Sequence, residues 1–200
     1  ILYKLYLNFV KKLIFDIETA GLPSRWNANN DDISGWPRIV ELAWVVLNEG
    51  YQATVSKSFI IKPQNFVIPK EASDVHGITN ERALQEGEDL KIVLKEFERD
   101  LEEVDLLIAH NIDFDFPVLN CEFIRSSFKT KFTYISTLCT MKSTTSLCNI
   151  PGKYGPKWPK LEELYNYLFN KNFQGAHRAI NDVKACAECF IQLKKLDFYK

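Results

Sequence analysis

The sequence predicts an α/β fold in which a mixed sheet carries helices on its faces, and three observations lead to this prediction. First, a short apolar run at residues 12–17 has the length and composition of a strand that is buried on both faces. Second, two β-branched and aromatic runs at 38–47 and 53–61 flank a short polar turn, which is typical of an antiparallel hairpin. Third, the strand candidates at 105–109 and 133–137 alternate with helical patterns, which favours parallel pairing.

Several segments between and after these strands show the apolar periodicity of helices. Thr79 is placed as an N-cap within the first of them. Pro117 is compatible with a helix if it lies in the first turn. The expected helical segments are 69–83, 89–103, 113–128, a segment that begins near Leu161, and 178–196.

Length and composition place these elements in one domain that spans residues 1–200. A chain of 200 residues with 46% hydrophobic content is long enough to bury a core, and no stretch approaches the roughly 20 apolar residues of a membrane span. Lys4 and Asn8 interrupt the apolar segment 1–10, Lys11 and Lys12 follow it, and there is no small-residue cleavage site. We therefore expect neither a signal peptide nor a membrane partner. The formal net charge of −1 means that any surface for nucleic acid is local.

The cysteines predict a reducing environment. They are five in number, an odd count, and lack the dense spacing of a disulfide framework, which favours a cytoplasmic location. Cys186 and Cys189 fall within the last helical pattern without a second pair of matching spacing. We therefore expect both thiols to face the core, and the alternative is a structural zinc site.

Asp16 and Glu18 break the apolar pattern at the carboxyl end of the first strand. Residues two positions apart point to the same face of a strand, so both carboxylates project the same way. Like charges at the end of a buried strand repel each other and are costly to desolvate, unless a cation lies between them. Divalent cations prefer such oxygen ligands, which suggests a metal site. The alternative is a strand that simply exits into solvent.

Two further acids are placed to join this pair. Asp115 follows the strand candidate at 105–109, and Asp182 lies about one turn into the last helix, five residues after His177. In an open parallel sheet, ligands gather beyond the carboxyl ends of the central strands. Each acid alone is explained by a helix cap or a surface charge, but the arrangement of all four predicts one shared site.

Four short motifs occur in order between residues 16 and 182. They are Asp16-x-Glu18-Thr19-x-Gly21, Val75-His76-Gly77-Ile78-Thr79, His110-Asn111-x-x-Phe114-Asp115 and His177-x-x-x-x-Asp182. Together they resemble the motifs of the DEDDh (DnaQ-like) 3′–5′ exonucleases of the ribonuclease-H-like superfamily. The histidine variant is indicated because the tyrosine variant needs a tyrosine where this chain has Arg178. The resemblance implies a mixed five-stranded sheet with one antiparallel strand and helices on both faces.

The resemblance also implies a two-metal hydrolysis of phosphodiester bonds at the 3′ end of a nucleic acid. Two divalent cations, Mg²⁺ or Mn²⁺, suit ligands that are all oxygen. His177 is the expected general base, because imidazole exchanges protons near working pH. The implied metal ligands are Asp16, Glu18, Asp115 and Asp182, and the residues implied near the terminal nucleotide are Thr19, Leu22, His76 and Phe114.

The expected substrate is single-stranded DNA with a free 3′ end, and the expected products are nucleoside 5′-monophosphates. The alternatives are an RNA-trimming exoribonuclease of the same family and a nucleic-acid-binding module on the same fold that has lost catalysis. The presence of all four acids and the histidine argues against the second alternative. The family includes stand-alone enzymes and proofreading subunits of polymerases, of the DNA polymerase III epsilon type. A DNA polymerase is therefore a second expected partner.

Two loops carry aromatic residues with more than one explanation. The polar loop 22–37 is longer than most connections, and we expect Trp26 and Trp36 to pin it to the core, with base stacking as the alternative. Its part 24–35 departs from the family pattern, which affects how substrate enters rather than the chemistry. The loop 152–160 is basic, aromatic and rich in Gly and Pro, which suits a phosphate backbone and a stacked base unless the loop is merely solvated.

Overall fold

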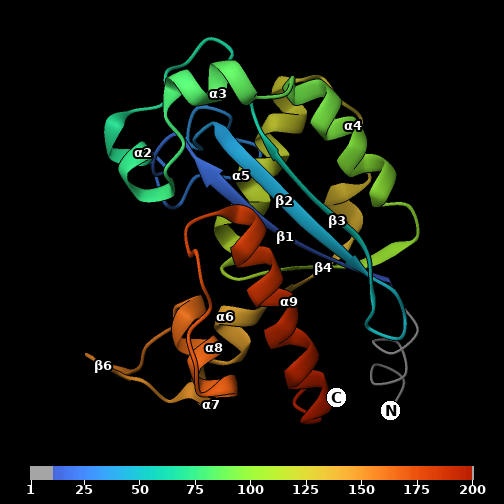
Figure 1. Cartoon of the computed structure of the whole chain (residues 1–200), viewed down its shortest axis with the longest axis vertical. Helices are drawn as coiled ribbons and strands as arrows, with labels where there is room; N and C mark the ends of the chain where they lie inside the picture. Colours follow the sequence, from blue (N-terminus) through green and yellow to red (C-terminus); the bar gives the residue numbers. More distant parts are fainter. Residues whose placement is uncertain (1–10, 200) are drawn as a thin grey trace.

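A twisted five-stranded sheet lies at the centre of the computed structural model, which describes residues 11–199 (Figure 1). The strands are β1 (Lys11–Thr19), β2 (Ile39–Leu47), β3 (Ala53–Ile60), β4 (Val104–Ala109) and β5 (Ser136–Cys139). They lie in the order β3-β2-β1-β4-β5, and β2 alone runs antiparallel to its neighbours in this sheet. The predicted mixed sheet with one antiparallel strand is therefore confirmed. The expectation that no signal peptide is present concerns residues 1–10 and lies outside the described residues.

Helices cover both faces of the sheet, as predicted. The helices α4 (Leu90–Asp100) and α5 (Ile112–Arg125) bury their apolar residues with those of one face, in a core rich in phenylalanine. The helix α9 (Ala179–Lys195) packs on the other face, against β1 and β2. Each helix has an apolar stripe that only packing against the sheet removes from water, which is why the chain forms these layers.

The alternation of side chains along β1 decides which face receives the acidic residues. Phe15 belongs to the core beneath α4 and α5, whereas Ile14 belongs to the core beneath α9. Because side chains alternate between faces, Asp16 and Glu18 project on the same side as Ile14. The two carboxylates therefore point toward the face that α9 covers.

The segment 69–83, expected to form short helical structure, contains helix α2 (Lys70–His76) and the start of helix α3 (Asn80–Glu86). Gly77 ends α2 in the left-handed region at φ 73°. The Thr79 hydroxyl accepts a hydrogen bond from the backbone N–H of Arg82 at 3.1 Å, which confirms the predicted N-cap. The left-handed glycine breaks the helix and places α2 at the edge of the site described below.

Two other predicted elements differ from the structure. The strand expected at 133–137 begins only at Ser136, because a 3₁₀ turn over Phe132–Tyr134 precedes it. This turn buries the Phe132 ring, which stacks on Phe116 with ring centroids 4.5 Å apart. Pro117 lies in the second turn of α5 and not in the first, because the helix begins at Ile112. A proline there costs one backbone hydrogen bond, but its ring restricts the backbone of the unfolded chain, which offsets part of that cost.

The carboxyl-terminal part of the chain adds short elements that the sequence pattern did not indicate. These are α6 (Thr140–Ser143), α7 (Thr145–Cys148) and the two-stranded hairpin of β6 (Pro151–Gly152) and β7 (Gly155–Pro156), followed by the expected α8 (Leu161–Phe169). Cys186 and Cys189 are both buried, as predicted, and Cys189 packs between α8 and α9. Among residues 11–199, no helix is long and apolar enough to cross a membrane. That residues 1–200 form a single domain stays a prediction.

Candidate active site

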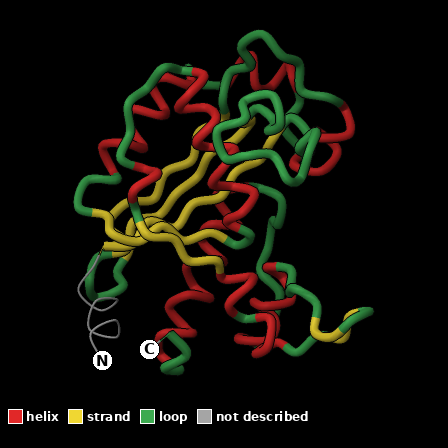
Figure 2. The backbone as a smooth tube through the Cα atoms, turned by 180° about the vertical axis from the view of Figure 1, so that it is seen from behind, coloured by secondary structure: helices red, strands yellow, loops and turns green. Residues whose placement is uncertain are grey.

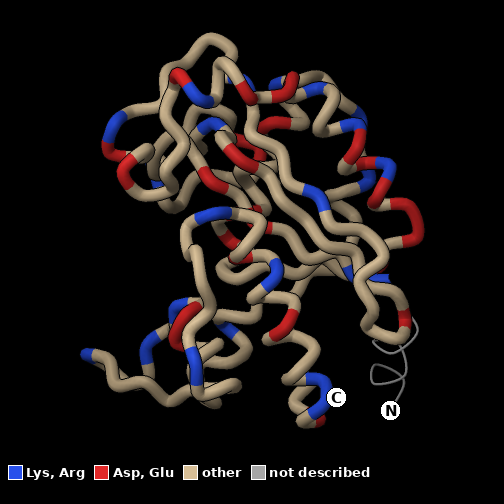
Figure 3. The backbone as a smooth tube through the Cα atoms, in the orientation of Figure 1, with Lys and Arg blue, Asp and Glu red and all other residues tan. Residues whose placement is uncertain are grey.

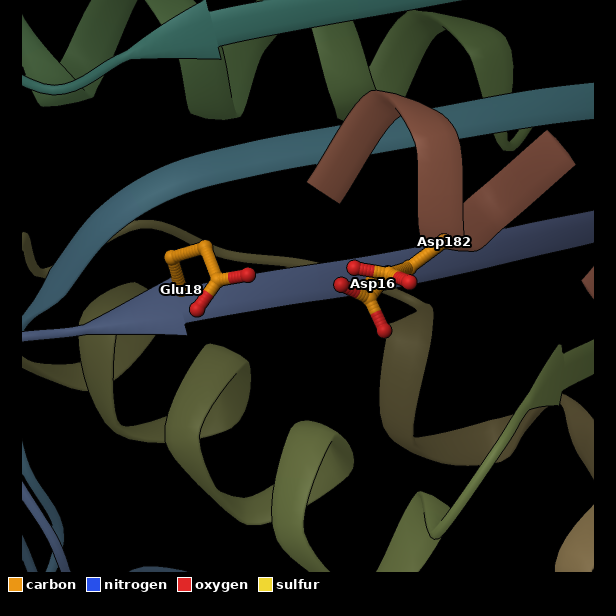
Figure 4. A group of neighbouring side chains, drawn as sticks. All are labelled: Asp16, Glu18 and Asp182. Atoms are coloured by element: carbon orange, nitrogen blue, oxygen red, sulfur yellow. The ribbon is translucent and has the colours of Figure 1, made fainter. Parts of the chain in front are cut away.

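Three carboxylates meet where the carboxyl end of β1 lies beside the first turn of α9. Asp16, Glu18 and Asp182 each bring an oxygen within 4.8 Å of the others (Figure 4). Within the described part of the chain, no other group of three acidic, histidine or cysteine side chains approaches so closely. The first turn of α9 carries Asp182 onto the face toward which Asp16 and Glu18 project, as Figure 4 shows.

The fourth predicted acid borders the same cavity from another element. Asp115 comes from the first turn of α5 and is 4% exposed. It lines a cavity of about 380 Å³ together with Asp16, Glu18, Asp182 and His177, although it is not part of the group within 4.8 Å. The structure thus gathers the four acids and the histidine of the three motifs around one cavity.

Burial and mutual repulsion raise the pKa of every acid in this cluster. The pKa of Glu18 is raised to about 8 by burial first and then by the charges of Asp182 and Glu41. Burial raises the pKa of Asp182 to about 6, although the backbone N–H of His177 opposes this. For Asp16 and Asp115 burial and neighbouring carboxylates raise the pKa well above the usual range of an aspartate.

The donor set suits a hard divalent cation. All four side chains offer carboxylate oxygens, the ligands that Mg²⁺ and Mn²⁺ prefer. A bound cation favours the ionised carboxylates that burial disfavours, so its charge compensates the repulsion within the cluster. The chemistry of these residues therefore matches a metal centre better than a stable cluster of free acids.

His177 lies at the rim of the cavity, immediately before α9, with an exposed side chain. Its backbone is in the left-handed region at φ 65°, an uncommon conformation for a histidine. This conformation turns the chain into α9, so that the exposed imidazole and the Asp182 carboxylate border one cavity although they are five residues apart. Such a backbone persists only where its surroundings hold it.

A buried ion pair anchors this turn. Glu41 of β2 is fully buried and pairs with Glu18 across the β1–β2 ladder. Its carboxylate accepts hydrogen bonds from Arg178 Nε at 3.0 Å, from Arg178 Nη2 at 3.1 Å and from the backbone N–H of Ala179 at 3.2 Å. The Ser58 hydroxyl donates a further bond at 2.8 Å. Because Arg178 directly follows His177, this ion pair fixes the start of α9 against the sheet.

A second, more apolar cavity of about 630 Å³ adjoins the first. Ile17, Glu18 and Phe114 line both cavities, so the two lie side by side along the carboxyl end of β1. All four residues that the resemblance implies near the terminal nucleotide line this second cavity, and they are Thr19, Leu22, His76 and Phe114. Leu22 is 76% exposed, so water surrounds most of an apolar side chain at the entrance.

His76 lines this cavity and carries a buried ring nitrogen without a hydrogen-bond partner within residues 11–199. Its side chain is 3% exposed, and Nδ1 accepts a hydrogen bond from the backbone N–H of Ile78 at 3.1 Å. Burial lowers the pKa of His76, which favours the neutral ring, although the Thr19 backbone opposes part of this effect. A neutral ring whose Nδ1 accepts carries its proton on Nε2, and Nε2 has no hydrogen-bond partner among the described residues.

The long loop 22–37 forms a wall beside Phe114. Trp36 is buried and its indole N–H donates to the Asn29 carbonyl at 2.9 Å, which confirms that this tryptophan pins the loop. The Arg125 guanidinium of α5 also donates to the Trp36 carbonyl at 2.7 Å. For Trp26 the same prediction is wrong, because its side chain is 65% exposed, although its ring and that of Trp36 both contact Phe114 with centroids 6.3 Å apart. The loop is held by Trp36 and α5, which leaves Trp26 at the surface.

Sequence reasoning missed the residues that anchor the site. Glu41 is the one acid within an otherwise apolar strand pattern, and a charge at such a position signals a buried partner. In the sequence, Arg178 indicates only that the tyrosine variant is absent. Lys160, the last residue of the basic loop 152–160, and Glu162, two positions after it, also line the carboxylate cavity.

Comparison with known proteins agrees with this geometry. The model of the RNase T family, described as exonuclease, matches residues 13–190. A structure of exonuclease I is similar with a TM-score of 0.74 and 19% identity, over 93% of this chain and 41% of that chain. E. coli exonuclease I in complex with a dT13 oligonucleotide gives a TM-score of 0.74 and 18% identity, over 95% of this chain and 43% of that one. Comparison with curated proteins gives no significant match.

The structural likeness concerns part of a larger protein. The chain spans about two fifths of the length of these exonuclease I chains. A zinc-bound form of an E. coli exonuclease I complex with single-stranded DNA is similar to the same extent, with a TM-score of 0.72. At identities below 20% the likeness establishes the fold, which is ribonuclease-H-like. Because the family model covers most of the chain and its acidic motifs meet in one cavity, the protein belongs to the RNase T family of exonucleases.

Proposed function

We propose that the protein is a metal-dependent 3′–5′ exonuclease of the DEDDh type, which releases nucleoside 5′-monophosphates from single-stranded DNA. The observation that carries this proposal is that the two cavities adjoin, with Glu18 and Phe114 lining both. A 3′-terminal nucleoside in the apolar cavity places its phosphodiester beside the carboxylates. Binding of the strand end in this cavity favours cleavage at the 3′ terminus.

Asp16, Glu18, Asp115 and Asp182 are the proposed ligands of two divalent cations, Mg²⁺ or Mn²⁺. When bound, the cations supply positive charge that stabilises the attacking and leaving oxygens of the displacement. The carboxylates hold this charge at the base of the cavity, on elements that the sheet and α9 keep rigid. Their raised pKa values mean that cation binding and proton release are coupled in this site.

His177 is the proposed general base. Its exposed imidazole borders the cavity beside Asp182 and takes the proton from the attacking water. The proton then passes to solvent, to which the imidazole is open. The ion pair of Arg178 with Glu41 keeps the preceding turn in place, which limits how far the imidazole moves from the water it activates.

The apolar cavity holds the terminal nucleoside. Leu22 and Phe114 are the proposed contacts to its base and sugar, because both present apolar surface at the cavity wall. The His76 Nε2–H is the proposed donor to a sugar or phosphate oxygen, which satisfies the one buried polar atom of the cavity that lacks a partner. Thr19 lines the same wall, with its hydroxyl bonded to the Gly21 carbonyl at 2.7 Å.

Single-stranded DNA is proposed first because structures of E. coli exonuclease I that resemble this chain hold DNA oligonucleotides such as dT13. A DNA polymerase as partner and a cytoplasmic location stay predictions from the sequence. A search for polymerase association begins with size-exclusion chromatography of the protein mixed with a purified replicative polymerase.

The test of this function is digestion of matched substrates labelled at the 5′ end. The substrates are a 20-mer of single-stranded DNA, the same sequence as RNA, the same DNA in duplex form, and a circular single strand. We expect a ladder that shortens from the 3′ end of the DNA strand in Mg²⁺ or Mn²⁺, no products in chelator, and inhibition by a 3′-phosphate. Asp16→Asn should be inactive, whereas Asp113→Asn, which changes an exposed acid on α5, should retain activity.

Each other outcome identifies an alternative. Faster digestion of RNA than of DNA would assign the enzyme to RNA trimming. Binding of the strands without any cleavage would assign a catalytically silent module. Cleavage of the circular strand by a homogeneous preparation would contradict the exonuclease proposal.

A further inference from the structure

Positive charge is strongly segregated along this chain. Residues 123–161 contain no aspartate or glutamate but carry seven lysine and arginine residues. Because the whole chain has a formal net charge of −1, the rest of it carries −8. The acidic remainder includes the carboxylate cavity, and the basic segment reaches that cavity through Lys160, which contributes to its lining.

The most exposed part of this basic segment is the β6–β7 hairpin. Pro151 pairs with Pro156 and Gly152 with Gly155, and the hairpin stands away from the helices around it (Figures 1 and 2). Gly155 has φ 126°, and a Cβ at Gly152 would lie 2.7 Å from the Gly155 carbonyl oxygen. The tight turn therefore depends on these glycines and presents the two residues between them to solvent.

Those two residues are Lys153 and Tyr154. The Tyr154 side chain is 90% exposed, and the Lys153 ammonium lies 5.0 Å from the centre of its ring. Figure 3 shows the positive charge at the tip of this hairpin. Trp158, nearer to the base of the hairpin, is 59% exposed. Exposed aromatic rings interleaved with lysines are typical of surfaces that bind single-stranded nucleic acid.

The base of the hairpin is fixed to the edge of the carboxylate cavity. His110 follows β4 and lines this cavity. Its Nδ1 bonds to the Thr140 hydroxyl at 2.9 Å, and its Nε2 donates to the Pro159 carbonyl at 3.0 Å. The next residue, Lys160, also lines the cavity. The hairpin is therefore an arm, residues 149–160, that begins at the rim of the active site and extends away from it.

The arm retains positive charge outside ion pairs. Lys157 bonds to both carboxylate oxygens of Glu163, at 2.6 and 2.7 Å, so its charge is paired. Neither Lys153 nor Lys160 forms an ion pair within residues 11–199, although the charge of Lys160 helps to lower the pKa of Glu163. Lys153 lies at the tip of the arm and Lys160 at the cavity, which marks a path between the two.

We propose that the arm 149–160 binds single-stranded DNA upstream of the nucleotide being removed, with Tyr154 stacking on a base and Lys153 and Lys160 contacting phosphates. This inference rests on the proposed function. A strand whose 3′ end enters a cavity lined by four acids meets electrostatic repulsion along its phosphates, and a basic arm at the rim offsets that repulsion. The tip lies roughly 10–20 Å from the rim if its residues rise by about 3.3 Å each, so it contacts bases about three to six nucleotides from the 3′ end.

The experiment compares long and short strands in binding. The variant pair Lys153→Ala/Tyr154→Ala removes the tip of the arm. The matched control is Lys129→Ala/Tyr134→Ala, because Tyr134 is 89% exposed and lies before β5, at the end of that strand away from the cavity. Each pair is combined with Asp16→Asn, so that bound strands are not digested. Fluorescence anisotropy then measures the Kd of 5′-labelled dT20 and dT3 at several salt concentrations.

We expect the arm variant to bind dT20 about 5- to 100-fold more weakly, the range that one lost base stack produces. The slope of log Kd against log salt should fall by about 0.7, which corresponds to one phosphate contact. Binding of dT3, which is too short to reach the tip, should not change, and the control pair should bind both strands like the parent.

Two results would overturn the proposal. One is unchanged binding of dT20 by the arm variant, and the other is an equal loss for dT3 and dT20, which would place the effect at the cavity and not along the arm. The proposed function is tested separately by hydrolysis of the p-nitrophenyl ester of thymidine 5′-monophosphate, a substrate that occupies the cavities alone. Hydrolysis by the parent and not by Asp16→Asn supports the proposed function, whether or not the arm binds DNA. No hydrolysis by the parent counts against the proposed function, while the binding of dT20 and dT3 still tests the arm.

Discussion

The substitution Asp16→Asn should stabilise the metal-free protein while it abolishes activity. Burial and the neighbouring carboxylates raise the pKa of Asp16, so the native state binds this proton more tightly than the unfolded chain does. Holding a proton at pH 7, about three pH units above the pKa of an unfolded aspartate, costs at most about 4 kcal/mol. Asparagine is neutral without taking up a proton, so it avoids this cost.

A separate argument gives a similar magnitude. Two unit charges 4.8 Å apart repel with about 3 kcal/mol at an effective dielectric constant of about 20. We therefore expect Asp16→Asn to raise the free energy of unfolding by about 3 kcal/mol in chelator at pH 7. For a chain of this size that corresponds to a melting temperature about 6–12 °C higher.

The dependence on pH distinguishes this effect from an improvement in packing. Below pH 4 the aspartate is protonated in both the native and the unfolded state, so parent and variant should melt with a constant difference there. As pH rises through 4 toward 8, the unfolded parent releases the proton that its native state retains, and the advantage of the variant should grow. The assay is thermal melting by circular dichroism from pH 4 to pH 8, in chelator and in excess Mn²⁺.

Metal should reverse the ranking. A cation binds the folded site and favours its ionised carboxylates, so Mn²⁺ should raise the melting temperature of the parent more than that of the variant. Asp113→Asn is the matched control, because this acid is exposed and paired with Lys142, and its loss should change stability by less than about 0.5 kcal/mol. The reasoning is refuted if Asp16→Asn melts no higher than the parent in chelator at pH 8, or gains as much from Mn²⁺.

Three further substitutions separate the roles within the site. His177→Ala should lower kcat by about 10²–10⁴-fold in steady-state kinetics while Mn²⁺ still raises its melting temperature, and loss of the metal response would make His177 a ligand. Arg178→Ala leaves the buried Glu41 carboxylate without its cation and should lower the free energy of unfolding, measured in urea, by about 2–3 kcal/mol. This is at the low end for buried ion pairs because Arg178 is 32% exposed. An unchanged urea midpoint would contradict the proposal that this ion pair anchors the start of α9. Leu22→Ala should leave the melting temperature unchanged, because this side chain is 76% exposed. The substitution should raise KM for a short DNA strand by about 3- to 10-fold. An unchanged KM would show that Leu22 does not contact the terminal nucleoside.

The elements that carry the site follow from local patterns in the sequence. Residues 13–15 are apolar on both faces of a strand, so the change to Asp16 and Glu18 is visible against that background. The hairpin that follows and the alternation of strands with helices then leave few topologies for the sheet. For this reason the sequence suffices to predict that the acids of β1, α5 and α9 gather at one edge.

The parts that the sequence did not predict depend on contacts between distant residues. The sequence around Glu41 does not indicate that Arg178, more than a hundred residues later, forms an ion pair with its carboxylate. In the same way, Phe132 delays the start of β5 because its ring stacks on Phe116, which belongs to another element. Trp26 and Trp36 look alike in the sequence, and only the position of α5 beneath the loop decides that one is buried.

The location of the anchor explains how a cluster of mutually repelling acids is kept together. Asp182 lies in the first turn of α9, where the repulsion from Asp16 and Glu18 would push the helix away from β1. Farther along, α9 is held by apolar packing against the sheet, but such packing does not fix the first turn, which bears the repulsion directly. The bonds from Arg178 and the Ala179 N–H to Glu41 act at that turn, and their acceptor is a strand residue opposite Glu18. The buried ion pair thus opposes the repulsion at the point where it acts, which keeps the carboxylates close enough to share a cation.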